Sequence, residues 1–236
     1  MLRDKLFLLV IFLTNIIQGI TGFAGTVLAM PPSILLQGID IAKPILNILG
    51  LLASIWIVVI SYKQLNKREF IKVMVIMFFG LLTGNYIYLI LPVPILLKIY
   101  AVFIIGIALK GIFVKKEIKL NEVVLVGIVF IAGIIHGMFV SGGPLLIIYA
   151  AKKFREKSEF RATVSGVWII LNSYLAYTHY KAGFFTGDTI KKLWWGIIPL
   201  ILGMIIGNIL HKKISQQFFL IVTYILLIIS GLTLIF

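Results

Sequence analysis

Residues 136–144 read His-Gly-Met-Phe-Val-Ser-Gly-Gly-Pro and lie at the centre of a long apolar run, residues 123–151. A second long run, residues 6–37, is interrupted in the same way by Gln-Gly-Ile-Thr-Gly-Phe-Ala-Gly at residues 18–25. As one helix, residues 6–37 would extend about 48 Å, well beyond the ~30 Å hydrocarbon core of a bilayer. Because glycine and proline interrupt helices, we predict that both runs form broken helices.

The composition excludes a soluble globular protein. Of 236 residues, 61% are hydrophobic and 13% are charged, against roughly 25% charged in an ordinary soluble domain. The mean hydropathy is +1.13. Six further apolar runs suit a single crossing of a bilayer: 43–62, 70–91, 95–114, 162–180, 193–210 and 216–236. We predict an all-α, multi-pass integral membrane protein of the cell membrane, with one transmembrane domain over residues 1–236 and a retained first helix.

The net charge of +14 comes from 22 Lys and Arg residues against 8 Asp and Glu residues. The basic residues cluster between apolar runs, where they orient a membrane protein, so we expect the lipid bilayer and no nucleic acid as a partner. The chain has no cysteine, which excludes disulfides and thiolate metal sites. It also lacks a Walker A loop, His-Glu-x-x-His and Gly-x-Ser-x-Gly. We therefore expect no enzyme activity, no cofactor and no metal.

The two halves of the chain match each other at glycine and polar positions. A shift of 118 residues places Gly19 on Gly137, Gly25 on Gly143, Lys43 on Arg161 and Tyr62 on Tyr180. A shift of 123 residues places Gly80 on Gly203, Gly84 on Gly207 and Asn85 on Asn208. Ordered matches of this kind indicate a repeat. We predict an internal duplication, with repeat 1 at residues 6–113, repeat 2 at residues 124–236 and a connecting loop at residues 114–123.

The positions of Lys and Arg distinguish two arrangements of these repeats. If each long run crosses the membrane once, each repeat has four spans and the halves are parallel. If each long run enters and leaves on one side, 15 of the 22 basic residues gather on one face, which obeys the positive-inside rule better. We favour this inverted arrangement, in which each repeat is a broken or re-entrant helix hairpin followed by three transmembrane helices. Loops 63–72, 110–122 and 152–161 then share the cytoplasmic face.

The glycine-rich residues 18–25 are followed by Pro31-Pro32, and the second glycine-rich stretch, 136–144, is followed by Arg-Ala-Thr-Val-Ser at residues 161–165. Together these stretches resemble the motifs of the TauE/SafE sulfite-exporter family. The resemblance covers essentially the whole chain, including the duplication. It implies a permease for small sulfur-containing or organic anions.

The predicted breaks have the chemistry of an anion site. A helix that begins inside the membrane leaves its first N–H groups unpaired, and its dipole adds partial positive charge there. Pro144 suits the first turn of such a helix, and Thr26 and Ser141 supply hydroxyl groups. Glycine lets a ligand approach the backbone closely, so the candidate binding residues include Gly22, Gly25, Gly142 and Gly143. The alternative is that these glycines only permit close helix packing.

His136 is the one ionisable residue near the centre of an apolar run, and Gln18 is its duplicate. Ionisable groups inside a membrane are functional candidates, so we list His136 and Gln18 as binding residues and His136 as a candidate for proton coupling. The alternative is a polar residue satisfied between helices. Asn47, Ser165 and Asn172 lie inside neighbouring apolar runs and are candidates to line a polar pathway.

Other polar positions allow two interpretations. Lys43 and Arg161 either attract anions to the mouth of a pathway or extend to the membrane interface as anchors. His179 lies near the end of its run and is expected at the interface. For the Gly-xxx-Gly pairs at positions 80/84 and 203/207, helix packing is the favoured interpretation.

These features predict a permease or exporter that moves a small anion, such as sulfite, an organosulfonate or a related organic anion. The mechanism would be alternating access around the paired starts of the half-helices. A passive anion channel is the alternative within transport. A membrane-embedded enzyme or a scaffold is the alternative from another class. The sequence leaves the substrate, the coupling ion and the oligomeric state open.

Overall fold

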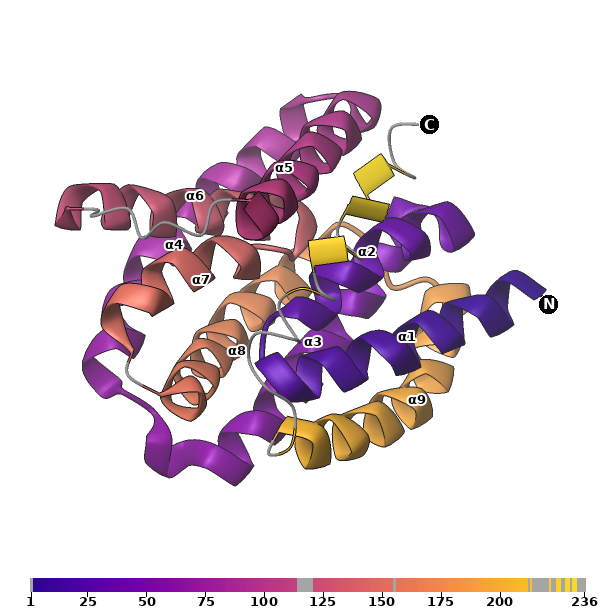
Figure 1. The fold of residues 1–236 in the computed structure, drawn as a ribbon. Helices are drawn as coiled ribbons and strands as arrows, with labels where there is room; N and C mark the ends of the chain where they lie inside the picture. Colours follow the sequence, from indigo (N-terminus) through magenta and orange to yellow (C-terminus); the bar gives the residue numbers. More distant parts are fainter. Residues whose placement is uncertain are drawn as a thin grey trace.

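A computed structural model describes residues 2–113, 121–154 and 156–211, and single positions 213, 221, 224, 225, 228, 229, 231 and 232 further on. The regular elements within these ranges are helices (Figure 1): α1 (Leu2–Thr21), α2 (Ala24–Gln37), α3 (Ile39–Ser61), the 3₁₀ turn η1 (Tyr62–Gln64), α4 (Lys67–Ile90), α5 (Val93–Phe113), α6 (Glu122–Phe139), α7 (Gly143–Lys153), α8 (Lys157–Lys181) and α9 (Gly187–His211). The prediction of an all-α protein is confirmed.

Both long apolar runs are broken where the glycines predict. The first break separates Thr21, the end of α1, from Ala24, the start of α2, and Gly22 within it has a φ of +83°. The second break follows Phe139, the end of α6, and contains Val140 with a φ of 55°. Among the described residues, Val140 is the one non-glycine residue with a positive φ, a costly conformation for a β-branched side chain.

Each broken helix folds back on itself as a hairpin. A Cβ on Gly25 would lie 2.7 Å from the carbonyl oxygen of Thr14, whereas a straight helix would separate these residues by about 16 Å. Gln37, the last residue of α2, donates a hydrogen bond of 3.2 Å to Asp4 near the start of α1. In the second hairpin, Gly142 packs against the carbonyl of Ala132.

The second hairpin also closes on itself and defines one end of the molecule. Glu122, the first residue of α6, binds Lys153 at the end of α7 with a distance of 2.8 Å, and it also binds Lys72 of α4. At this basic end the backbone N–H of Asn66 donates to the hydroxyl of Thr163 (2.9 Å). Loops 63–72 and 152–161 therefore share one end, as predicted, while its assignment to the cytoplasm stays a prediction.

The first hairpin starts at the opposite end. Lys192, near the start of α9, lies 3.8 Å from Asp4 of α1 and 2.6 Å from Asp188. The far end of α9 lies at the basic end, because the carbonyl of His211 accepts a hydrogen bond from Lys157 (2.9 Å). A helix of this length extends about 37 Å. Hairpin α1–α2 and hairpin α6–α7 therefore enter the molecule from opposite ends.

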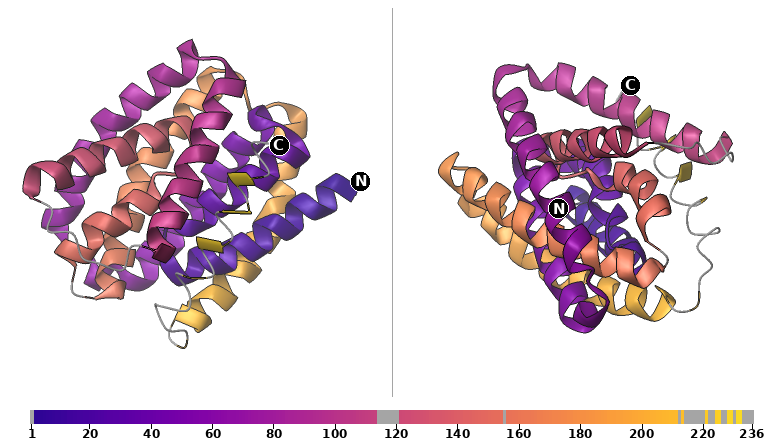
Figure 2. Two further views of the ribbon diagram at one scale, coloured as in Figure 1. Left: turned by 45° about the horizontal axis from the view of Figure 1, so that its top comes forward. Right: turned by 90° about the vertical axis from the view of Figure 1, so that its left-hand side faces the viewer.

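Helix α1 packs along α9, and α4 packs along α6, with α3 and α8 crossing between these pairs (Figures 1 and 2). In the first seam, Gly203 and Gly207 of α9 lie directly on the backbone carbonyls of Phe12 and Ile16 of α1. A Cβ on Gly203 would lie 2.6 Å from the Phe12 oxygen, so only glycine allows this approach.

The seam between α4 and α6 has the same construction. Gly80 lies on the carbonyl of Phe130, and Gly84 lies on the carbonyl of Ile134. Phe130 and Ile134 lie 118 residues after Phe12 and Ile16, whose carbonyls contact the other glycine pair. Gly203 and Gly207 lie 123 residues after Gly80 and Gly84. The interpretation of both Gly-xxx-Gly pairs as packing sites is confirmed.

Six helices of the described residues are long and apolar enough to cross a membrane: α1, α3 with η1, α4, α5, α6 and α9. The run predicted at 162–180 lies in α8, which is 25 residues long but is not among the six. Helix α8 is packed against α3, and its buried face carries polar residues, including Ser165 and Asn172. Most of the predicted loop 114–123 and of the predicted run 216–236 lies outside the described residues.

Candidate functional site

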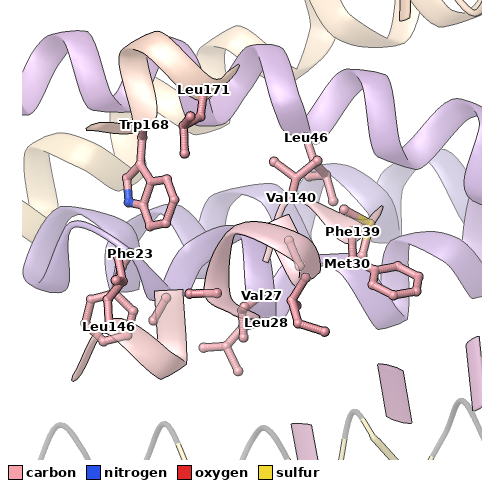
Figure 3. Close-up of a cluster of buried hydrophobic side chains, with 14 of the residues drawn as sticks. Phe23, Val27, Leu28, Met30, Leu46, Phe139, Val140, Leu146, Trp168 and Leu171 are labelled. Carbon is pink, nitrogen blue, oxygen red and sulfur yellow. The ribbon is translucent and has the colours of Figure 1, made fainter. Parts of the chain in front are cut away.

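A small cavity lies where the two breaks meet between α3 and α8. Its free volume of about 10 Å³ matches a single water molecule, so it has no room for an anion such as sulfite in this conformation. Five residues predicted as candidates line it: Gln18, Thr26, His136, Gly143 and Asn172. The other lining residues are Phe23, Gly50, Ser54, Val140 and Trp168. Figure 3 shows the indole of Trp168 pointing from α8 toward Phe23 of the first break.

The first break is capped by its own side chains. The side-chain oxygen Oε1 of Gln18 accepts a hydrogen bond of 2.9 Å from the backbone N–H of Gly25. The hydroxyl of Thr21 accepts from the N–H groups of Ala24 (3.2 Å) and Phe23 (3.3 Å). The N–H groups of Ala24 and Gly25, the first two of α2, are therefore bonded within the protein in this conformation, although the sequence predicts this helix start to hold an anion.

The second break is built differently. Among the described hydrogen bonds, none caps the backbone N–H of Ser141, Gly142 or Gly143 with a side chain. Ser141 does not line the cavity: its hydroxyl donates to the carbonyl of Phe139 and accepts from the hydroxyl of Tyr100, each at 2.8 Å. The start of α7 therefore differs from the start of α2, where side chains accept from the N–H groups.

The glycines of the two breaks correspond with an offset of one residue. Gly25 packs on Thr14 and on the Cβ of Gln18, and Gly142 packs on Ala132 and on the Cβ of His136. Gly142, rather than the Gly143 that the 118-residue shift assigns, is therefore the structural counterpart of Gly25. Gly143 instead faces the first break, since a Cβ there would lie 2.9 Å from the Cβ of Phe23.

His136 connects the second break to α8. Its side chain is 2% exposed, and its Nε2 lies 2.9 Å from the Oδ1 of Asn172. The imidazole stacks on Trp168 with ring centroids 4.4 Å apart and an angle of 18° between the planes. Because Asn172 Oδ1 is an acceptor, Nε2 carries the proton, and Nδ1 is left without a partner among the described residues.

The remaining predicted residues surround the cavity without lining it: Gly22, Gly25, Asn47, Ser141, Gly142 and Ser165. The carbonyl of Gly22 accepts a hydrogen bond of 3.2 Å from the indole of Trp168. Asn47 donates from Nδ2 to the carbonyl of Asn172 (3.1 Å). The hydroxyl of Ser165 is buried and has no partner among the described residues.

Phe23, Gly50, Ser54, Val140 and Trp168 line the cavity although the sequence analysis did not select them. Part of this set could have been found from the 118-residue shift, which pairs Gly50 with Trp168 and Ser54 with Asn172. The same shift pairs Gln18 with His136. Three pairs of equivalent positions therefore line one cavity.

The interface position expected for His179 is wrong, and the burial of Lys43 and Arg161 contradicts the anchor alternative for these two side chains. Lys43 is 2% exposed, and its ammonium lies 3.4 Å from the centre of the Tyr88 ring. Arg161 is 5% exposed and donates from Nη2 to the Oδ1 of Asn208 (3.2 Å). His179 is also buried, and neither ring nitrogen has a partner among the described residues. No cluster of residues suited to a metal ion occurs within the described ranges.

The comparisons with known proteins agree with this architecture. Residues 7–234 match the family model described as sulfite exporter TauE/SafE. The probable inner membrane transporter protein TsaS of Comamonas testosteroni is 30% identical over 105 residues, which is 44% of this chain and 44% of that protein. No solved structure gives a significant match. Because the family model covers nearly the whole chain, the resemblance seen in the glycine-rich stretches is confirmed, and the chain belongs to the sulfite exporter TauE/SafE family.

Proposed function

We propose that the protein is a permease of the cell membrane that moves a small anion, such as sulfite or an organosulfonate, through the cavity between the two breaks. The observation that carries this proposal is the meeting of Gln18 and His136, one from each broken helix, in one small polar cavity. The printed name of the TsaS relative describes a transporter of the inner membrane, which supports the same role and location here.

The anion would bind to the paired starts of α2 and α7. Helix N-termini attract negative charge, and the N–H groups at the start of α7 have no side-chain cap among the described hydrogen bonds. At the start of α2 the anion would replace the Oε1 of Gln18 as the acceptor of the Gly25 N–H. His136 and Asn172 supply hydrogen bonds on the opposite wall, and a protonated His136 would add a charge.

Two inverted repeats would supply the alternating access. The seams α1–α9 and α4–α6 use equivalent residues, and the two hairpins start from opposite ends of the molecule. Both observations support the predicted duplication and its inverted orientation. In inverted-repeat transporters one repeat rocks against the other around a fixed site, which opens the site to each side in turn.

A cavity with room for one water molecule supports a carrier more than a passive channel, because it offers no continuous path for an anion. A carrier needs an occluded state between its two open states, whereas a channel needs a continuous path. A membrane-embedded enzyme receives no support from the site, because its titratable side chain is a single histidine bonded to an amide.

Reconstituted uptake tests this proposal. Purified protein in liposomes should take up at least one of radiolabelled sulfite, methanesulfonate and sulfoacetate in a saturable way, with and without a pH gradient. A dependence on the gradient would support proton coupling. Absence of saturable uptake for every anion in the panel would refute the permease proposal.

A further inference from the structure

Helix α3 carries a stripe of polar and small residues that leads from one end of the molecule to the cavity. The stripe consists of Lys43, Asn47, Gly50 and Ser54, whose spacing of four, three and four residues places them on one helix face. Gly50 and Ser54 line the cavity.

Helix α8 carries the equivalent stripe from the other end. It consists of Arg161, Ser165, Trp168 and Asn172, each 118 residues after its counterpart in α3. Trp168 and Asn172 line the cavity. Arg161, Ser165 and Trp168 all approach Gly22 of the first break: a Cβ on Gly22 would lie 2.9 Å from the Arg161 Cγ and 3.3 Å from the Ser165 Oγ.

The outer residue of each stripe is a buried cation without a carboxylate partner among the described ion pairs. The Lys43 ammonium is covered by Tyr88, and the exposed Asp40 acts on it only beyond ion-pair distance. The Nε of Arg161 is buried and makes no hydrogen bond to a described residue. Burying an unpaired cation is costly, so this chain keeps two of them at a cost in stability.

The second residue of each stripe is also incompletely bonded. The Oδ1 of Asn47 and the Oγ of Ser165 are buried without hydrogen-bond partners among the described residues. Each lies one helical turn from its cation, on the side toward the cavity. The pairs Lys43–Asn47 and Arg161–Ser165 therefore have unused capacity to bind a ligand, and they lie at opposite ends of the cavity.

The two cations lie toward opposite ends of the molecule. Lys43 lies near the start of α3. This helix begins two residues after Gln37, whose side chain is bonded to Asp4. Arg161 follows the start of α8, where Lys157 is bonded to the carbonyl of His211 at the basic end. The cavity lies between them along both helices.

We propose that Lys43–Asn47 and Arg161–Ser165 are two anion-binding stations, one on each side of the central cavity, at which the transported anion is held before and after it occupies the cavity. The inference rests on the proposed permease function and extends it by two sites. The anion replaces Tyr88 as the partner of Lys43 at one end. At the other end it accepts a hydrogen bond from the free Nε–H of Arg161. Each station offers a cation and a polar side chain, which is the recognition expected for a sulfite or sulfonate oxygen.

The opposite positions of the stations give a sided test. Uptake of radiolabelled sulfite is measured in right-side-out and inside-out membrane vesicles for the wild type, Lys43→Met and Arg161→Met. Each substitution should raise KM about tenfold from one side only, the loss expected for one charge-assisted hydrogen bond. The two variants should affect opposite sides, with Arg161→Met acting from the cytoplasmic side.

Matched controls remove an exposed cation at the same ends: Lys98→Met and Lys67→Met should leave KM unchanged from both sides. Thermal unfolding separates a binding role from a structural one, because loss of an unpaired buried charge should leave the melting temperature equal or higher.

If either variant fails to fold, Asn47→Ala and Ser165→Ala replace them in the test. These two variants must also raise KM from opposite sides of the membrane. Unchanged KM values, or equal changes of KM from both sides, would contradict the proposal of two anion-binding stations. Wild-type vesicles without sulfite uptake would instead contradict the proposed function for sulfite.

Discussion

The two breaks have the same backbone plan but different chemistry. At the first break Gln18 and Thr21 accept the N–H groups at the start of α2, and the positive φ falls on Gly22, where it costs little. At the second break the described hydrogen bonds include no side-chain cap, and the positive φ falls on Val140, where it is costly. Strain and unused donors are therefore concentrated in the second break.

In the proposed mechanism this difference gives the two halves of the site separate roles. An anion would have to displace Gln18 to reach the Gly25 N–H at the first break. The second break would bind the anion without losing such a cap, and it supplies the titratable group His136, which is held by Asn172 and Trp168. Two hairpins of the same plan would thus place one capped and one uncapped helix start around the same cavity.

The largest effect is expected from Gln18→Glu, which replaces the neutral amide that accepts from the Gly25 N–H with a negatively charged carboxylate. A carboxylate would hold the Gly25 N–H more strongly and would repel a second anion nearby, by about 4 kcal/mol at 4 Å. We expect a loss of kcat/KM for sulfite uptake of about 10²- to 10³-fold. Gln64→Glu adds the same charge in the exposed turn η1 and should behave as wild type. A Gln18→Glu protein with activity within twofold of wild type would show that the first break does not bind the anion.

Equal losses of stability are expected when the two seams are overpacked. Gly84→Ala would press a methyl group onto the carbonyl of Ile134, and Gly207→Ala would press one onto the carbonyl of Ile16. Each should lower the free energy of unfolding by about 1–3 kcal/mol, measured as a lower melting temperature in detergent. Gly106→Ala meets open space and serves as the control. A large loss of stability from one substitution with none from the other would contradict the proposed equivalence of the two repeats.

A smaller effect is expected from His136→Gln, which makes the second break resemble the first. Glutamine can still donate to Asn172, but it loses the stacking on Trp168, worth about 0.5–1.5 kcal/mol, and the ability to become charged. We expect a loss of uptake of about two- to tenfold. If His136 exchanges a proton during transport, wild-type uptake should depend on pH between 5 and 8, and the variant should lose this dependence. The same pH profile in both proteins would assign His136 to packing.

The sequence was sufficient to predict the breaks because run length showed that an interruption was needed. Gly22 and the Gly142-Gly143-Pro144 sequence marked where a helix could stop or start, whereas proline alone did not, since Pro31 and Pro32 lie inside α2. The shared end of loops 63–72 and 152–161 was also predictable, because it follows from charge counts. Phe23 and Trp168 could not be selected, since an aromatic residue that lines a cavity has the same sequence pattern as one in a core.

Burial and bonding of polar side chains were beyond the sequence for a different reason. Lys43 and Arg161 lie near helix starts, where a charged side chain normally reaches the interface, and only the packing of Tyr88 and Asn208 keeps them inside. The bond from Gly25 to Gln18 depends on how tightly the hairpin closes. The one-residue offset between Gly25 and Gly142 depends on the different shapes of the two breaks.

A counterflow assay with Gly143→Leu tests most directly the central claim, that the anion passes through the cavity between the two breaks. A leucine there would project onto Phe23 and fill the cavity, whereas Gly127→Leu places the same side chain on α6 in open space. Liposomes loaded with unlabelled sulfite should accumulate radiolabelled sulfite transiently with wild type and Gly127→Leu, because a carrier exchanges its substrate. Gly143→Leu, checked for folding by its melting temperature, should show no accumulation. Undiminished counterflow by a folded Gly143→Leu protein would contradict transport through the cavity between the two breaks.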